Sequence, residues 1–108
     1  MTKLALMHCA PGGQATALES ADIQTYVDEL NGWEKVGNEI KKSFGFKNYH
    51  ETMAFVNASA WVSHQEDHHP DMSVHYNKCV VAYSTHDAGG ITLNDFICAA
   101  KLDALLAD

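Results

Sequence analysis

The sequence of 108 residues has no arginine, two prolines, three cysteines and no long hydrophobic run. Its 7 basic residues stand against 14 acidic ones, which gives a formal net charge of −7. Such a surface repels the phosphates of nucleic acids and of anionic membranes, so direct nucleic-acid binding and membrane binding are not expected. No stretch approaches the ~20 apolar residues of a membrane span. The cysteines are widely spaced and form no CxxC pair, so we expect reduced thiols in a cytoplasmic protein.

The length of the chain fits a single domain with one core. Residues 1–19 include Pro11-Gly12-Gly13 and show no sustained apolar periodicity, which indicates an irregular N-terminal segment. Residues 20–108 carry periodic apolar positions almost throughout, and we expect them to form the folded domain.

The apolar spacing alternates between the periods of helices and of strands. Three helices are expected, with Ser20, Asn48 and Thr92 as their caps, and the second of them should run as far as Pro70. Four strands are expected over residues 33–36, 39–46, 73–76 and 78–85. The order α-β-β-α-β-β-α is typical of an α+β fold in which a four-stranded antiparallel sheet has its helices packed on one face.

The expected second helix has an unusually broad apolar surface. Large apolar side chains such as Tyr49 and Trp61 lie on different sides of it. One side can pack on the sheet, and in so small a chain a second subunit is the simplest cover for the other. We therefore expect a homo-oligomer, dimer or tetramer, with the helix over residues 49–62 at its interface.

Four of the seven histidines lie between residues 64 and 75. Histidine exchanges a proton near its ordinary pKa of ~6.5, so the cluster indicates proton transfer or metal binding. On a continuing helix His64 and His68 would share a face and could hold zinc, although Gln65 stands where the HExxH motif has its glutamate. A third interpretation is a solvated helix end, where the helix dipole favours a cationic histidine. The residues alone leave all three open.

Two further polar residues fall at element ends, where side chains can line a cleft. His86 closes the last expected strand, and Asp95 lies in the first turn of the last expected helix. Each also has a purely structural interpretation, His86 as a surface histidine and Asp95 as a carboxylate stabilised by the helix dipole. Tyr76 is expected in the sheet core with its hydroxyl at the rim.

The spacing of these residues resembles that of the pterin-4a-carbinolamine dehydratases. In that family a polar or charged residue stands four positions before a His-His-Pro triplet, and an aromatic residue, a histidine and an aspartate follow. The matching residues here are His64, His68, His69, Pro70, Tyr76, His86 and Asp95. The likeness covers about residues 20–106. His64 is a departure, because many relatives carry a carboxylate at that place.

The resemblance implies a hydro-lyase that converts 4a-hydroxytetrahydropterin to quinonoid dihydropterin and water. This step recycles tetrahydropterin after an aromatic amino-acid hydroxylase has used it, and it needs no metal and no organic cofactor. The resemblance implies three catalytic residues, with His68 and His86 as the proton-transfer pair and His69 chiefly holding the pterin. It assigns substrate binding and positioning to His64, Pro70, Tyr76 and Asp95.

A second function is open because some members of this family also act as dimerisation cofactors of a homeodomain transcription factor. They do so through protein contacts and not through DNA. The apolar helix over residues 49–62 is compatible with a coactivator of this kind, and equally with self-association. A third possibility is a relative that keeps the fold and has lost the activity. The complete motif argues against this possibility. Turnover requires the histidines, whereas partner binding requires the helix face.

Overall fold

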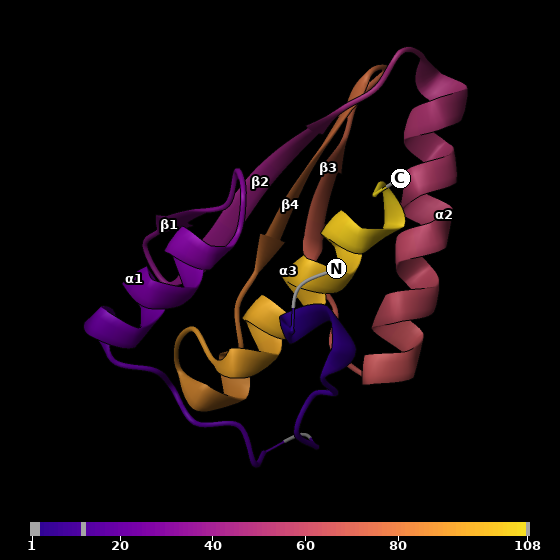
Figure 1. Ribbon diagram of the computed structural model, residues 1–108. Coiled ribbons are helices and arrows are strands. Elements are labelled where there is room, and N and C mark those ends of the chain that lie inside the picture. The colour runs from indigo at the N-terminus through magenta and orange to yellow at the C-terminus, as the bar shows by residue number, and fades with distance from the viewer. Residues whose placement is uncertain (1–2, 12, 108) are drawn as a thin grey trace.

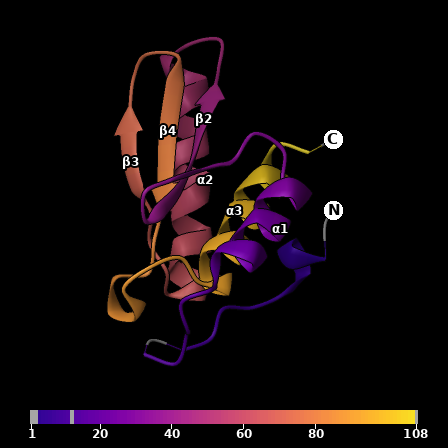
Figure 2. The same cartoon turned by 90° about the vertical axis from the view of Figure 1, so that its left-hand side faces the viewer.

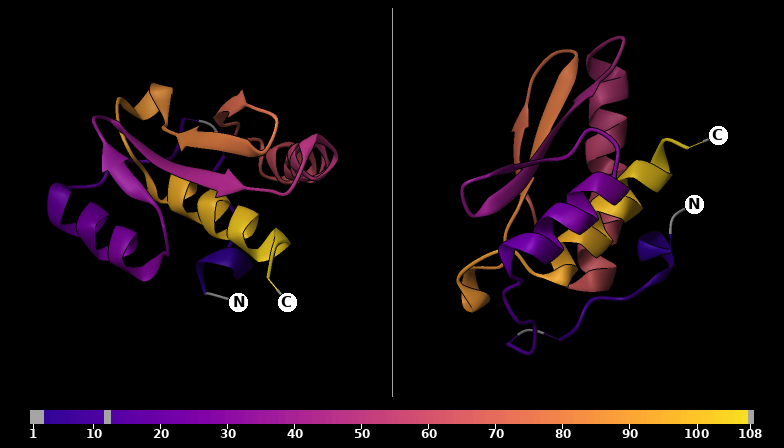
Figure 3. Two further views of the ribbon diagram at one scale, coloured as in Figure 1. Left: turned by 90° about the horizontal axis from the view of Figure 1, so that it is seen from above. Right: turned by 60° about the vertical axis from the view of Figure 1, so that its left-hand side comes forward.

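The computed structural model describes residues 3–11 and 13–107 and has the expected α+β architecture (Figure 1). Its elements are the short 3₁₀ helix η1 (Leu4–Leu6), α1 (Ser20–Glu29), β1 (Glu34–Val36), β2 (Glu39–Gly45), α2 (Tyr49–Glu66), β3 (Asp71–Val74), β4 (Lys78–Tyr83), a second 3₁₀ helix η2 (His86–Ala88) and α3 (Leu93–Leu105). The strands form one antiparallel sheet in the order β1-β2-β4-β3. The α-helices lie on one face of this sheet (Figure 3), so the predicted fold is confirmed.

The sheet buries one face against the helices. β2 pairs with β4 from Ile40 opposite Tyr83 to Gly45 opposite Lys78. Alternate residues such as Ile40, Val81 and Tyr83 are completely buried, as the two-residue period of a strand requires. The two-residue turn between β1 and β2 also matches its prediction, with Gly37 in the left-handed region at φ 60°.

α2 begins as its sequence predicts and ends earlier. The Asn48 side chain accepts a hydrogen bond from the Glu51 backbone N–H at 2.9 Å, which confirms the cap. The helix then stops at Glu66, because Asp67 adopts a left-handed conformation with φ 50°. The expectation that the helix runs to Pro70 is therefore wrong. His68 lies beyond the helix end, so His64 and His68 do not share a helix face.

Other boundaries also differ from their predictions. β4 ends at Tyr83, so His86 begins η2 and does not close the strand. Glu19, not Ser20, is the N-cap of α1, and Ser20 is the first helical residue. β3 starts at Asp71, directly after Pro70, so the β3–β4 turn falls earlier than expected. Tyr76 consequently lies in that turn with 65% of its surface exposed, and its expected place in the sheet core is wrong.

Residues 4–10 of the N-terminal segment pack along α3 and reach the end of α2 (Figure 2). Leu4 is buried in the main hydrophobic core. The backbone N–H of Cys9 donates to Glu66 at 2.7 Å, and that of Ala10 donates to Asn94 at 2.9 Å. Residues 4–10 therefore join the C-terminal end of α2 to the first turns of α3. Among the described residues, no helix combines the length and apolar character needed to cross a membrane.

Candidate active site

His68 is held by a buried carboxylate. Its Nε2 lies 2.6 Å from Oδ1 of Asp95, and the two side chains are 12% and 0% exposed. The His68 ring stacks on Tyr83 of β4, with centroids 5.7 Å apart and planes 10° apart. An ionised carboxylate can only accept hydrogen bonds, so His68 donates through Nε2–H. Its Nδ1 makes no hydrogen bond to another described residue.

Asp95 is held in turn by the start of α3. Thr92 and Asp95 form the predicted capping box, in which the Thr92 backbone N–H donates to Asp95 Oδ2 at 2.9 Å. The Thr85 hydroxyl donates to the same oxygen at 3.0 Å. The helix-cap interpretation of Asp95 is thus correct, and the same carboxylate also binds a histidine.

All three candidate catalytic histidines line one pocket. Its volume is about 260 Å³, and its lining comes from the end of α2 and from the segment after β4. The lining residues are Asp67, His68, His69, Ser84, Thr85, His86 and Asp87. His69 and His86 are exposed, in contrast to His68. This histidine pocket therefore offers one anchored, largely buried imidazole and two exposed ones.

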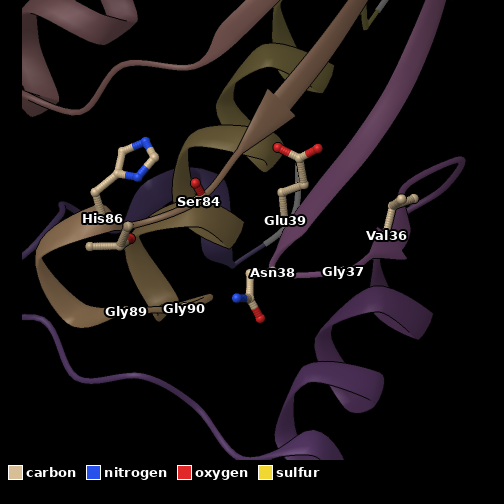
Figure 4. Close-up of a pocket in the computed structure, with 9 residues that line it drawn as sticks. Val36, Gly37, Asn38, Glu39, Ser84, His86, Gly89 and Gly90 are labelled. Atoms are coloured by element: carbon tan, nitrogen blue, oxygen red, sulfur yellow. The ribbon is translucent and has the colours of Figure 1, made fainter.

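A second cavity lies against the segment from Ser84 to His86. Its volume is about 510 Å³, and residues 36–39 of the β1–β2 turn form its far wall. Figure 4 shows the Glu39 carboxylate and the Asn38 amide across from Ser84, with the His86 imidazole beyond it. Ser84, Thr85 and His86 line both cavities. The larger cavity contains none of the other candidate residues.

Two of the candidate residues do not join the histidine pocket within one chain. His64 is exposed on α2, where its ring lies 5.8 Å from that of Trp61. Tyr76 lies near the opposite end of α2, since its carbonyl accepts a hydrogen bond from Thr52 at 3.0 Å. Pro70 links the pocket to β3. In the part of the chain that the structure describes, no group of three or more His, Cys, Asp or Glu side chains is placed to hold a metal ion.

Glu66 fixes the N-terminal segment beside the pocket. Its side chain is 4% exposed and lies 2.9 Å from Nδ1 of His8. Burial opposes ionisation of this carboxyl, but hydrogen bonds from the Cys9 backbone and His8 and the charge of Lys101 outweigh it, so the pKa of Glu66 is lowered. Glu66, the last residue of α2, is therefore a buried anion that holds His8 and Cys9 beside the histidine pocket. We call this set of contacts the Glu66 clamp.

Sequence reasoning missed two residues that contact the pocket histidine or its partner. Tyr83 lies under the His68 ring, and Thr85 donates to Asp95. In the sequence, only the position of Thr85 immediately before His86 could have indicated that Thr85 belongs to the site. The sequence gives no indication of a site role for Tyr83, because an apolar strand position predicts only core packing.

Fold and site together define a small α+β protein with a histidine-lined pocket and a buried aspartate. Residues 16–105 match the family described as pterin 4 alpha carbinolamine dehydratase. The chain belongs to this family of hydro-lyases. A protein from Chromobacterium violaceum that carries the name pterin-4-alpha-carbinolamine dehydratase is 59% identical over 99 residues, which are 92% of each chain. A similarly named protein from Nitrosospira multiformis is 54% identical over 94% of this chain and 91% of its own.

Two solved structures share the fold. A protein from Brucella melitensis, described as a transcriptional coactivator/pterin dehydratase, superposes with a TM-score of 0.82 at 30% identity. The match covers 85% of this chain and 100% of that one. A pterin dehydratase-like protein described as a RuBisCO assembly factor in the alpha-carboxysome gives a TM-score of 0.62 at 25% identity, over 72% and 93% of the two chains. Proteins with this fold are thus described both as enzymes and as protein-assembly factors.

Proposed function

We propose that this protein dehydrates 4a-hydroxytetrahydropterin to quinonoid dihydropterin and water, in the recycling of tetrahydropterin. The observation that carries the proposal is the His68–Asp95 pair at a pocket that His69 and His86 also line. The family and the similar named proteins support the substrate class. A hydroxylase that forms the 4a-hydroxy compound is the expected source of the substrate, and the proposed site of action is the cytoplasm.

The reaction needs one acid and one base. Protonation of the 4a-hydroxyl lets the C4a–O bond break and water leave. Loss of the N5 proton supplies the electron pair of the new N5=C4a double bond. Two histidines near neutral pH can perform both transfers, and in the proposed mechanism no metal or organic cofactor takes part.

We assign the base to His68 and the acid to His86. The Nε2–H of His68 is engaged by Asp95, so Nδ1 carries the lone pair that can accept the N5 proton. The negative charge of Asp95 then stabilises the imidazolium that forms. His86 is exposed in η2 and has no comparable partner among the described residues. It can therefore give a proton to the departing hydroxyl and take another from solvent.

His69 completes the proposed site as a residue that holds the pterin, and Pro70 shapes the segment that carries it. Asp95 is a positioning residue because it acts through His68. Within a single chain, His64 and Tyr76 lie outside the pocket. The proposed chemistry therefore assigns no step to either of them.

Self-association is the second part of the proposal. Tyr49 and Trp61 on α2 are 53% and 62% exposed, and Leu105 and Leu106 at the end of α3 are 40% and 49% exposed. Leu105 and Leu106 also line a groove of about 340 Å³ between α2 and the end of α3, with Ala54, Phe55 and Ala58 on its α2 side. Burial of such side chains stabilises association. The same surface would serve a protein-binding coactivator, which remains the alternative function.

The test is to follow dehydration of 4a-hydroxytetrahydropterin, formed in situ by an aromatic amino-acid hydroxylase. We expect His68→Ala and His86→Ala to lower kcat by about 10²-fold each. His69→Ala should chiefly weaken binding of tetrahydropterin, measured by equilibrium titration. His50→Ala is the matched control, since His50 is an exposed histidine near the start of α2. Full turnover by His68→Ala with weaker binding alone would refute the assignment of His68.

A further inference from the structure

The carboxylate of Asp95 has more donors than a helix cap requires. Oδ2 accepts the Thr92 backbone N–H, which belongs to the capping box. It also accepts the Thr85 hydroxyl at 3.0 Å, from a residue outside α3. Because both donors lie on Oδ2, Oδ1 is left for His68. Asp95 is fully buried, so water does not compete for these positions.

The direction of the hydrogen bonds at Thr85 follows from the acceptor. An ionised carboxylate has no proton, so the single hydroxyl proton of Thr85 must point at Asp95. The Thr85 and Thr92 hydroxyl oxygens lie 2.8 Å apart. Since the Thr85 proton is already used, Thr92 donates to Thr85. Two threonine hydroxyls therefore form a one-way chain of donors that ends on the carboxylate.

The backbone of Thr85 is fixed by its own loop. Its N–H donates to the Gly90 carbonyl at 3.0 Å, and its carbonyl accepts from Ala88 at 3.1 Å. His86 is the next residue and lines the histidine pocket. The Thr85 hydroxyl thus ties the loop that carries His86 to the carboxylate that holds His68.

We propose that Thr85 is a positioning residue, whose hydroxyl orients Asp95 so that Asp95 keeps His68 in the Nε2–H form with Nδ1 free. The consequence for turnover rests on the proposed dehydratase function, but the effect on the His68 tautomer does not. Without the hydroxyl, Oδ2 loses one of its two donors and the carboxylate can rotate about its terminal bond. The preference of His68 for one tautomer then weakens, and fewer molecules present the basic nitrogen to the pocket.

The experiment compares Thr85→Val, which keeps the branched shape and removes the hydroxyl, with Thr85→Ser, which keeps the hydroxyl. The first readout is the tautomer of neutral His68, from imidazole ¹⁵N chemical shifts assigned by their loss in His68→Gln. The native chain and Thr85→Ser should hold Nε2–H as the dominant form, whereas Thr85→Val should give a mixture. The second readout is dehydration, in which Thr85→Val should lower kcat about tenfold with KM nearly unchanged.

The outcomes separate the two proposals. If Thr85→Val keeps the native tautomer and a kcat within about twofold of native, the role of Thr85 is overturned. If the native chain does not accelerate dehydration, the proposed function fails, while the ¹⁵N comparison still decides the role of Thr85. Circular dichroism checks that each variant folds. Should Thr85→Val be unfolded, Thr85→Ala removes the hydroxyl without placing a methyl group against the carboxylate, and the same two readouts apply.

Discussion

Nε2 of His68 lies 2.6 Å from Oδ1 of Asp95, between the end of α2 and the first turn of α3. The two residues are far apart in the sequence, and the fold brings them together beneath a pocket that two more histidines line. The carboxylate has no contact with solvent. It therefore fixes which nitrogen of His68 carries the proton.

Replacement of Asp95 by asparagine should remove this control. Asp95→Asn keeps the size of the side chain and removes the charge that stabilises an imidazolium, so kcat should fall by about 10²-fold or more with little change in KM. Steady-state dehydration kinetics measure this. Asp103→Asn is the matched control, because Asp103 also lies on α3 but binds Lys42 and Trp33. Native kcat in Asp95→Asn would contradict the positioning role.

Removal of the Tyr83 hydroxyl should leave the stability of the protein nearly unchanged. The Tyr83 hydroxyl is buried and has no hydrogen-bond partner among the described residues, and burial raises the pKa of this phenol, which stays neutral. Tyr83→Phe keeps the ring that stacks on His68 and should change the free energy of unfolding by no more than about 1 kcal/mol, in either direction. Tyr83→Ala should destabilise by about 3–5 kcal/mol. Urea denaturation distinguishes the two, and a large loss in Tyr83→Phe would reveal a partner for the hydroxyl.

The Glu66 clamp should make stability depend on acid pH. The pKa of Glu66 is lowered from its ordinary value of 4.5, so the folded state binds a proton at this group less readily than the unfolded state does. The resulting stabilisation is present above pH 4.5 and is lost as the pH falls through the lower folded-state value. Glu66→Gln should lose part of this dependence. Unfolding free energies measured from pH 6 down to pH 3 test it, and identical slopes for native and Glu66→Gln would contradict it.

A charge on the exposed face of α2 should disrupt self-association. Trp61 is the most exposed aromatic side chain of that helix, at 62%. Trp61→Glu should lower the molar mass seen by sedimentation equilibrium, because it places a carboxylate in the proposed interface. Gln65→Glu is the control, since it adds the same charge at an exposed polar position near the end of α2. An unchanged mass in Trp61→Glu would move the interface elsewhere.

Two of the thiols should resist alkylation in the folded protein. Cys79 and Cys98 are completely buried. Burial raises the pKa of the Cys79 thiol, and the hydrogen bond with Cys9 together with burial raises that of Cys98. The thiolate is the reactive form, so both should react with iodoacetamide at pH 8 only after denaturation. Mass spectrometry of native and denatured samples measures this, and rapid native labelling of either would show that its surroundings open.

The fold was predictable because local signals and long-range packing agree. Asn48 and Thr92 each place a cap before a periodic apolar run, and the Gly37-Asn38 turn sets the register of β1 and β2. The end of α2 was not predictable from Pro70. A proline excludes helix only for the residues next to it, whereas the helix actually ends where Asp67 enters the left-handed region.

The residues of the candidate pocket were predictable from their spacing, and its geometry only in part. The spacing pointed to His68, His69 and His86, and the fold brings them to one pocket. The same spacing gave equal weight to Tyr76, whose position depends on where the β3–β4 turn falls. The pairing of Val74 with Cys79 sets that turn, and such cross-strand register is not encoded in spacing along one segment.

The most direct test of this account is the rate at which 4a-hydroxytetrahydropterin loses water with the native chain, compared with His68→Gln/His86→Gln and with buffer alone. The account predicts a strong acceleration by the native chain that the double variant loses while it remains folded. A native chain that leaves the uncatalysed rate unchanged, or a folded double variant as fast as the native chain, would contradict it.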